Sequence, residues 1–182
     1  MSNSFEILMN QLGMPAEMRQ APALAQADIE RVVVHKISKI WEFHFVFSNV
    51  LPIEIFLELK KGLSEEFSKT GNKAIFEIKA LSQEFSNQLL QAYYREAFSE
   101  GPCASQGFKS LYQNLQVRAE GNQLFIEGSE AIDKEHFKKN HLPNLAKQLE
   151  KFGFPTFNCQ VEKNDVLTQE QEEAFHAENE QI

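Results

Sequence analysis

Three side chains that could bind a metal ion or transfer protons lie close together in the sequence. They are His35, Glu42 and His44. Two imidazoles and a carboxylate can ligate a divalent metal or act as acid and base. The alternative is a set of surface pairs, since charge-complementary neighbours on facing strands each stabilise a sheet by about 0.2–1 kcal/mol. We favour surface pairs, because such pairs are common on the open faces of hairpins.

A second group of side chains could contact DNA. These candidate DNA-binding residues are Lys134, Lys138, Lys139, Lys147 and Lys151, which could form a basic stripe on one helical stretch. Glu135 and Glu150 interrupt the stripe. The net charge of −8 also argues against a dedicated nucleic-acid binder, because such proteins gain most of their affinity by neutralising phosphates.

A third group could anchor a protein partner. We expect Tyr93, Tyr94 and Phe125 to be exposed, and exposed aromatic side chains often dominate binding energy at protein interfaces. The chain has no GxGxxG, GxxxxGK[ST] or GxSxG motif, and Cys103 and Cys159 form no CxxC pattern. The sequence therefore predicts no catalytic residue, no metal site and no cofactor, and two reduced thiols in a cytoplasmic protein.

The stretch from Arg31 to Phe67 organises the first half of the chain. Val32–Ile37 and Ile40–Phe47 are rich in β-branched and aromatic residues, with only Ser38 and Lys39 between them, which predicts a tight hairpin. The simplest register pairs Ile37 with Ile40, Lys36 with Trp41, His35 with Glu42, Val34 with Phe43 and Val32 with Phe45.

Alternation along these strands predicts one apolar face and one mostly polar face. The apolar face holds Val32, Val34, Trp41, Phe43, Phe45 and Phe47, and the polar face holds Arg31, Val33, His35, Glu42 and His44. A helix that starts at Pro52 can cover the apolar face, because Phe56, Leu59, Leu63 and Phe67 recur at helical spacing. A third strand is expected over residues 74–80.

The second half repeats this order at an offset of roughly 83 residues. We expect a helix over 85–98, another over 108–115, a hairpin around Gly121-Asn122, a helix from Asp133 that Pro143 interrupts, and a strand over 157–161. Trp41 and Phe43 would correspond to Leu124 and Ile126, Val34 to Val117, and Phe76 and Ile78 to Cys159 and Val161. Chance recurrence in an α+β protein is the alternative to a true duplication.

The predicted fold is therefore α+β, with two small α-β-β-α-β units, each a three-stranded sheet with helices on one face. Unit I spans residues 1–80 and unit II residues 81–164. Residues 165–182 form an acidic tail or the start of a linker. No apolar run approaches the roughly 20 residues needed to cross a bilayer, and MSNSFEILMN lacks the features of a secretion signal.

Several strings resemble one protein family. VHKISKIWEFHFVFSNVLPIEIFLELKKGL at Val34–Leu63, QLLQAYYREAF at Gln88–Phe98 and HLPNLAKQLEKFGFP at His141–Pro155 resemble the start of the PolC-type DNA polymerase III alpha subunit of low-GC Gram-positive bacteria. The resemblance extends from about Phe5 to Val161. In that family this region precedes the polymerase and 3′–5′ exonuclease domains, so the resemblance implies a non-catalytic N-terminal region of a DNA-directed DNA polymerase.

The family also suggests a role for the region. One of its N-terminal parts has been likened to the polymerase-binding domain of the clamp-loader tau subunit, a KH-like fold without the nucleic-acid loop. The resemblance thus implies a pseudo-KH-like module that docks replisome proteins, such as a clamp-loader subunit, a helicase or a primase, with DNA bound through the rest of the polymerase. The absence of a GxxG loop here agrees with that expectation. The alternative is an auxiliary module that binds single-stranded DNA.

Overall fold

The computed structural model of the chain describes residues 1–128 and 134–163. The first half contains α1 (Asn3–Gln11), α2 (Ala16–Arg19), the 3-10 helix η1 (Pro22–Leu24), β1 (Asp28–His35), β2 (Ile40–Phe47), α3 (Ile53–Ser68) and β3 (Lys73–Ala80). The second half contains α4 (Asn87–Glu96), η2 (Gly101–Cys103), α5 (Gln106–Tyr112), β4 (Gln116–Glu120), β5 (Gln123–Gly128), α6 (Lys134–Asn140), α7 (Leu142–Lys151) and β6 (Asn158–Lys163).

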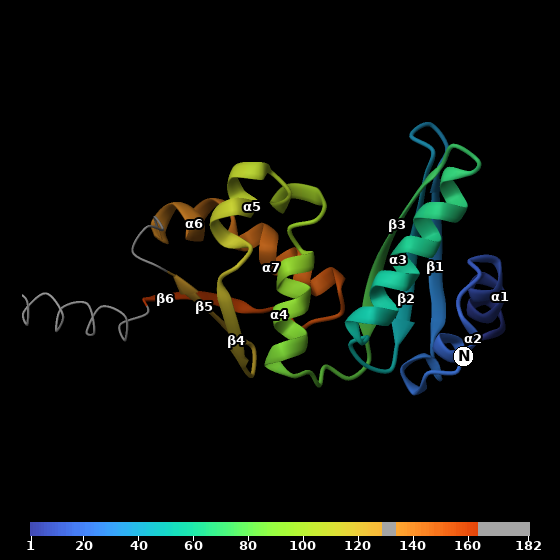
Figure 1. Cartoon of the computed structure of the whole chain (residues 1–182), viewed down its shortest axis with the longest axis horizontal. Coiled ribbons are helices and arrows are strands. Elements are labelled where there is room, and N and C mark those ends of the chain that lie inside the picture. Colours follow the sequence, from blue (N-terminus) through green and yellow to red (C-terminus); the bar gives the residue numbers. More distant parts are fainter. Residues whose placement is uncertain (129–133, 164–182) are drawn as a thin grey trace, which may run out of the picture.

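Each half builds one three-stranded sheet, and the two sheets have the same topology. The strand orders are β1-β2-β3 and β4-β5-β6, with the first pair antiparallel and the second pair parallel in both. Figure 1 shows the two units side by side along the long axis of the molecule. The prediction of an α+β fold with two small three-stranded units is confirmed.

The register of the first hairpin differs from the predicted one by two residues. His35 pairs with Ile40, Val34 with Trp41 and Val32 with Phe43. Residues 36–39 form a four-residue connection in which Lys39 adopts a left-handed φ of 55°. A shift of two residues keeps every side chain on its predicted face, because side chains alternate with a period of two.

The apolar face of the first sheet is covered by α1 and α3. Phe5 of α1 packs edge-to-face on Phe45 and Phe47, with ring centroids 5.7 and 5.5 Å away. Phe67 of α3 packs on Trp41 and on Phe43, at 5.4 Å in each case. Burial of such rings is the main source of stability of a small sheet-and-helix layer, at about 1.5–3 kcal/mol each.

The two units share one core. Phe56 of α3 contacts Tyr93 of α4 and Phe152, which follows α7, with ring centroids 5.1 Å apart in both pairs. The Tyr93 hydroxyl donates a hydrogen bond to the Leu51 carbonyl oxygen at 2.8 Å. Lys60 Nζ lies 2.6 Å from Glu96 Oε1. These contacts make the pair of units one packed body.

The second unit differs from the first mainly in its turns and its helices. Gly121 and Asn122 form a two-residue turn between β4 and β5, with Gly121 at φ 59°. This turn is two residues shorter than the turn at residues 36–39. Since Phe43 pairs with Val32 and its equivalent Ile126 pairs with Val117, Val117 corresponds to Val32 and not to Val34. The pairings to the third strands likewise match Cys159 with Ala74 and Val161 with Phe76. The equivalences predicted for Val117, Cys159 and Val161 are therefore each wrong by two positions.

The helical stretch restarts at Pro143, as the sequence indicated, because Pro143 lies in the first turn of α7. α6 ends at Asn140 and α7 begins at Leu142. The predicted helix start at Asp133 and the predicted acidic tail from residue 165 lie outside the described residues. In the part of the chain that is described, no helix is long and apolar enough to cross a membrane.

Candidate functional site

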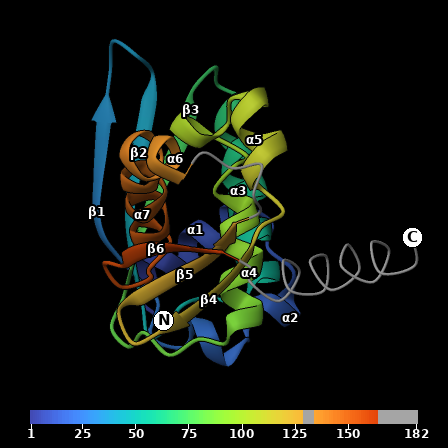
Figure 2. The same ribbon diagram turned by 90° about the vertical axis from the view of Figure 1, so that its left-hand side faces the viewer.

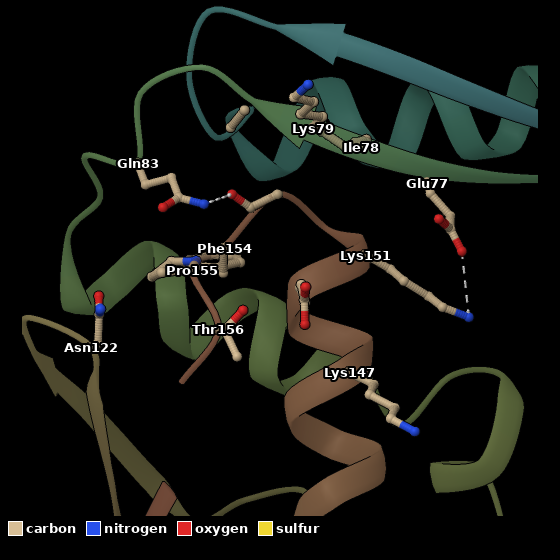
Figure 3. A pocket seen from close by; sticks show the side chains of 13 residues that line it. Glu77, Ile78, Lys79, Gln83, Asn122, Lys147, Lys151, Phe154, Pro155 and Thr156 are labelled. Carbon is tan, nitrogen blue, oxygen red and sulfur yellow. Dashed lines mark hydrogen bonds and ion pairs between the residues drawn. The ribbon is translucent and has the colours of Figure 1, made fainter. Parts of the chain in front are cut away.

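A cleft between the two units brings together residues from distant parts of the sequence. It has a volume of about 630 Å³ and is lined by residues 77–80 of β3, Gln83, α7 and residues 153–156 (Figure 3). Lys147 and Lys151 of α7 line it. Lys151 Nζ lies 3.7 Å from Glu77 Oε1, and Gln83 Nε2 donates to the Gly153 carbonyl oxygen at 3.4 Å.

The predicted lysine stripe is divided between two helices. Lys138 and Lys139 are exposed on α6, whereas Lys147 and Lys151 border the cleft on α7. Lys134 begins α6, but its side chain lies outside the described residues. Glu77 and Glu150 also line the cleft, so its positive charge is partly neutralised. DNA binding by these five lysines stays a prediction.

The exposure expected for Tyr93 and Tyr94 is wrong. Both side chains are fully buried in the interior of the fold. The Tyr94 hydroxyl donates to the Tyr112 carbonyl oxygen at 2.7 Å, and Tyr93 bonds to Leu51 as described above. Burial also raises the pKa of both phenols well above its ordinary value. The two tyrosines hold α4 against both halves of the molecule, and their side chains are not available to anchor a partner.

Phe125 lies on the open face of the second sheet, where it is half-buried. The Arg118 guanidinium carbon lies 4.2 Å from the ring centroid, a cation–π geometry. Arg118 Nη2 also donates to Glu162 Oε2 at 2.9 Å. A partner that binds Phe125 must therefore displace or accommodate Arg118. A role for Phe125 in partner binding stays a prediction.

The His35, Glu42 and His44 side chains meet on the open face of the first sheet. His35 Nε2 lies 3.2 Å from Glu42 Oε2, and His44 Nε2 lies 2.7 Å from Glu42 Oε1. Arg31 Nη2 is 3.2 Å from the same His44 nitrogen, so a cation already stands where a metal would bind. Within residues 1–128 and 134–163, no group of three or more His, Cys, Asp or Glu is placed to hold a metal ion.

This network predicts a weak pH dependence of stability. The hydrogen bonds from His35 and His44 lower the pKa of Glu42 below its ordinary 4.5. A lowered pKa stabilises the fold above pH 4.5, and that contribution is lost as the pH falls through the folded-state pKa. We expect Glu42→Gln to cost about 0.2–1 kcal/mol at neutral pH, with the difference from the parent chain vanishing in acid. Urea unfolding of both chains, from neutral pH to below pH 4.5, measures this difference in the free energy of unfolding.

The cysteines offer no activated nucleophile. Burial raises the pKa of the Cys103 thiol and of the Cys159 thiol to about 11 in each case. Both groups are therefore protonated near neutral pH, whereas a nucleophilic cysteine needs a lowered pKa.

One exposed surface was not found by sequence reasoning. We call residues 32–39 the hairpin arm, which carries the turn at one extremity of the molecule (Figure 2). Ile37 is fully exposed at its tip, and Val32 and Val34 are 39% and 41% exposed. Lys36 and Lys39 flank Ile37. The predicted register had placed Ile37 inside a strand; the lysines and the serine around it were the signal for a turn.

Comparison with known proteins identifies the family. Residues 4–78 match the family model described as DNA polymerase III polC-type N-terminus I. Residues 92–182 match the model described as DNA polymerase III polC-type N-terminus II. The chain belongs to the N-terminal region of the PolC-type DNA polymerase III family.

Individual PolC-type relatives agree over nearly the whole chain. The DNA polymerase III PolC-type of Streptococcus pneumoniae serotype 2 is 97% identical over 179 residues, which is 98% of this chain. Those of Streptococcus sanguinis and Streptococcus suis are 62% and 46% identical over 182 residues, which is 100% of this chain. In each case the chain spans only 12% of the relative's length. No solved structure matches the chain.

Proposed function

We propose that this region is a non-catalytic docking module that tethers a replicative DNA polymerase to other replisome proteins, such as a clamp-loader subunit, a helicase or a primase. The polymerase and 3′–5′ exonuclease activities belong, in this proposal, to other parts of the longer protein. The family membership and the raised thiol pKa values support a binding role over a catalytic one. The net charge of −8 favours a protein over DNA as the partner.

The observation that carries the proposal is the hairpin arm. Isolated exposed apolar residues are normal on a protein surface, but Val32, Val34 and Ile37 lie on one short arm and include a fully exposed isoleucine. An apolar anchor that enters a partner's pocket, with polar residues around it, is the usual centre of a protein interface. Lys36 and Lys39 can form that polar rim against an acidic partner surface.

We expect Ile37→Asp to weaken partner binding strongly while leaving the fold intact. A central apolar anchor typically contributes 2 kcal/mol or more, so the Kd should rise at least about thirty-fold. The measurement is calorimetric titration of the chain with purified clamp-loader, helicase and primase subunits. Ile7→Asp is the matched control, because Ile7 is 51% exposed on α1 of the same unit and away from the arm.

Equal binding by the parent chain and the Ile37→Asp chain would show that the arm is not the docking surface. Absence of binding to every subunit, together with salt-sensitive binding to a single-stranded oligonucleotide, would favour the alternative DNA-binding function. The observation behind that alternative is a set of lysines that take part in no ion pair within the described part of the chain, namely Lys138, Lys139 and Lys147.

A further inference from the structure

The strand β3 has a free edge. It is the last strand of the order β1-β2-β3, and it pairs with β2 in an unbroken register. Lys73 N donates to Lys39 O and Leu81 N donates to Phe47 O, both at 2.9 Å, so the odd-numbered residues of β3 turn their backbone groups towards β2. The even-numbered residues Ala74, Phe76, Ile78 and Ala80 therefore direct theirs away from the sheet.

Only the first half of this edge is open. The backbone at Gly153, after α7, lies against the second half so closely that a β-carbon at position 153 would be 3.1 Å from Ile78 Cγ2 and 3.3 Å from Ala80 Cβ. Ala74 and Phe76 face a cleft of about 800 Å³ instead. Its walls are α3 on one side, and the end of α4, Gly101 and α7 on the other. This volume lies in the range of ordinary binding pockets.

The apolar side chains of the cleft lie on both sides of the free edge. Leu57 of α3 is 43% exposed on the helix-covered side of the sheet. Ile75 is 37% exposed on the opposite face, because it pairs with Glu42 of the open face. Side chains of an added strand would alternate between these two faces. Such a strand would thus find one apolar contact on each face.

The charges of the cleft favour an acidic occupant. Lys60 is paired with Glu96 and Glu100, at 2.6 and 3.6 Å, and Lys151 with Glu77 at 3.7 Å. Lys61 and Lys73 also line the cleft, are exposed, and take part in no ion pair within the described residues. Four lysines and three glutamates line the cleft, so its net charge is +1, and the two lysines outside these ion pairs are available to an acidic occupant.

We propose that the open half of β3 binds an extended segment of a partner protein as a fourth strand of the first sheet. In this segment pairs of apolar residues alternate with pairs of acidic residues, so that each face of the strand carries both kinds. Backbone hydrogen bonds to Ala74 and Phe76 supply affinity, and Leu57, Ile75, Lys61 and Lys73 select the side chains. The inference rests on the proposed docking function, since it names the kind of segment that is docked and a second surface that docks it.

The test uses a short fluorescent peptide in which pairs of valines alternate with pairs of glutamates, titrated against the whole chain and followed by anisotropy. The same peptide with lysine in place of glutamate is the control for charge. We expect the acidic peptide to bind, the basic peptide not to bind, and added salt to weaken the complex. In amide spectra, the largest changes and new protection from hydrogen exchange should fall on Ala74 and Phe76.

Two variants separate the edge from the charge. Ala74→Pro removes the outward N–H without removing a hydrogen bond to β2, and should weaken peptide binding about three- to ten-fold. Lys61→Glu changes only an exposed side chain and should weaken binding to a similar extent. Lys138→Glu, on α6, is its matched control and should have no effect.

Equal binding of the acidic and basic peptides, or amide changes centred on α6 and α7 instead of β3, would overturn the inference. Unchanged affinity in the Lys61→Glu chain would do the same. If Ile37→Asp strongly weakens binding to a replisome subunit while no acidic peptide binds the parent chain, the docking function stands and the β3 site is rejected.

Discussion

Gly153→Ala is expected to destabilise the chain by about 2–4 kcal/mol. Gly153 has a φ of +102°, a conformation that residues with a side chain rarely adopt, at a cost of about 1–3 kcal/mol. The new β-carbon would also press on Ile78 and Ala80, and overpacking typically adds about 1–3 kcal/mol. Because Gly153 lies where the second unit meets β3, the strain falls on the contact between the two units. Urea unfolding followed by fluorescence of Trp41 measures the change.

Gly107→Ala is the matched control for this substitution. Gly107 lies in α5, and a β-carbon there would meet no atom within 4 Å. Alanine in a helix is more stable than glycine by up to about 1 kcal/mol, so this variant should be neutral or slightly more stable. Equal stability of the Gly153→Ala chain and the parent would mean that the two units do not pack at Gly153.

Tyr93→Ala is expected to cost about 3–5 kcal/mol, the usual price of deleting a large buried ring. Tyr93 is fully buried and contacts Phe56, Phe152 and Phe154, with ring centroids 5.1, 5.3 and 5.2 Å away. Its hydroxyl also donates to the Leu51 carbonyl oxygen across the boundary between the units. Tyr93→Phe removes only that hydrogen bond and should cost about 0.5–1.5 kcal/mol. Equilibrium unfolding of the two variants measures both changes in the free energy of unfolding.

Phe125→Ala provides the comparison. Phe125 is half-buried on the open face of the second sheet, so its removal should cost about 1 kcal/mol or less. A chain that tolerates Tyr93→Ala as well as Phe125→Ala would contradict a shared core, and would restore Tyr93 as a candidate for surface binding.

Local sequence patterns predicted most of the secondary structure. Alternation along residues 40–47 and helical spacing from Phe56 to Phe67 placed the buried faces correctly, because these periods follow from backbone geometry alone. The turn at Gly121-Asn122 was also predicted, since these residues favour a two-residue hairpin turn. The length of the first hairpin turn was not predicted, because its four residues contain no glycine and Lys39 adopts a positive φ that the sequence does not indicate.

The candidate sites depend on tertiary contacts that no local pattern contains. Tyr93 and Tyr94 were expected to be exposed. The first unit covers Tyr93, through Phe56 and the Leu51 carbonyl, whereas Tyr94 is buried within the second unit, where its hydroxyl reaches the Tyr112 carbonyl. The cleft of Figure 3 pairs Glu77 with Lys151, which only the docking of the two units brings together. The free edge of β3 likewise follows from the strand order and from the approach of Gly153.

Photo-crosslinking tests the docking function most directly. A benzophenone amino acid would replace Ile37, or Ile7 as the control, in the full polymerase that carries this region. After irradiation of nuclease-treated lysate, we expect the probe at position 37 to form a crosslink to a clamp-loader, helicase or primase subunit, and the probe at position 7 to form none. Absence of any such crosslink at position 37, or equal crosslinks from both positions, would contradict docking through the hairpin arm.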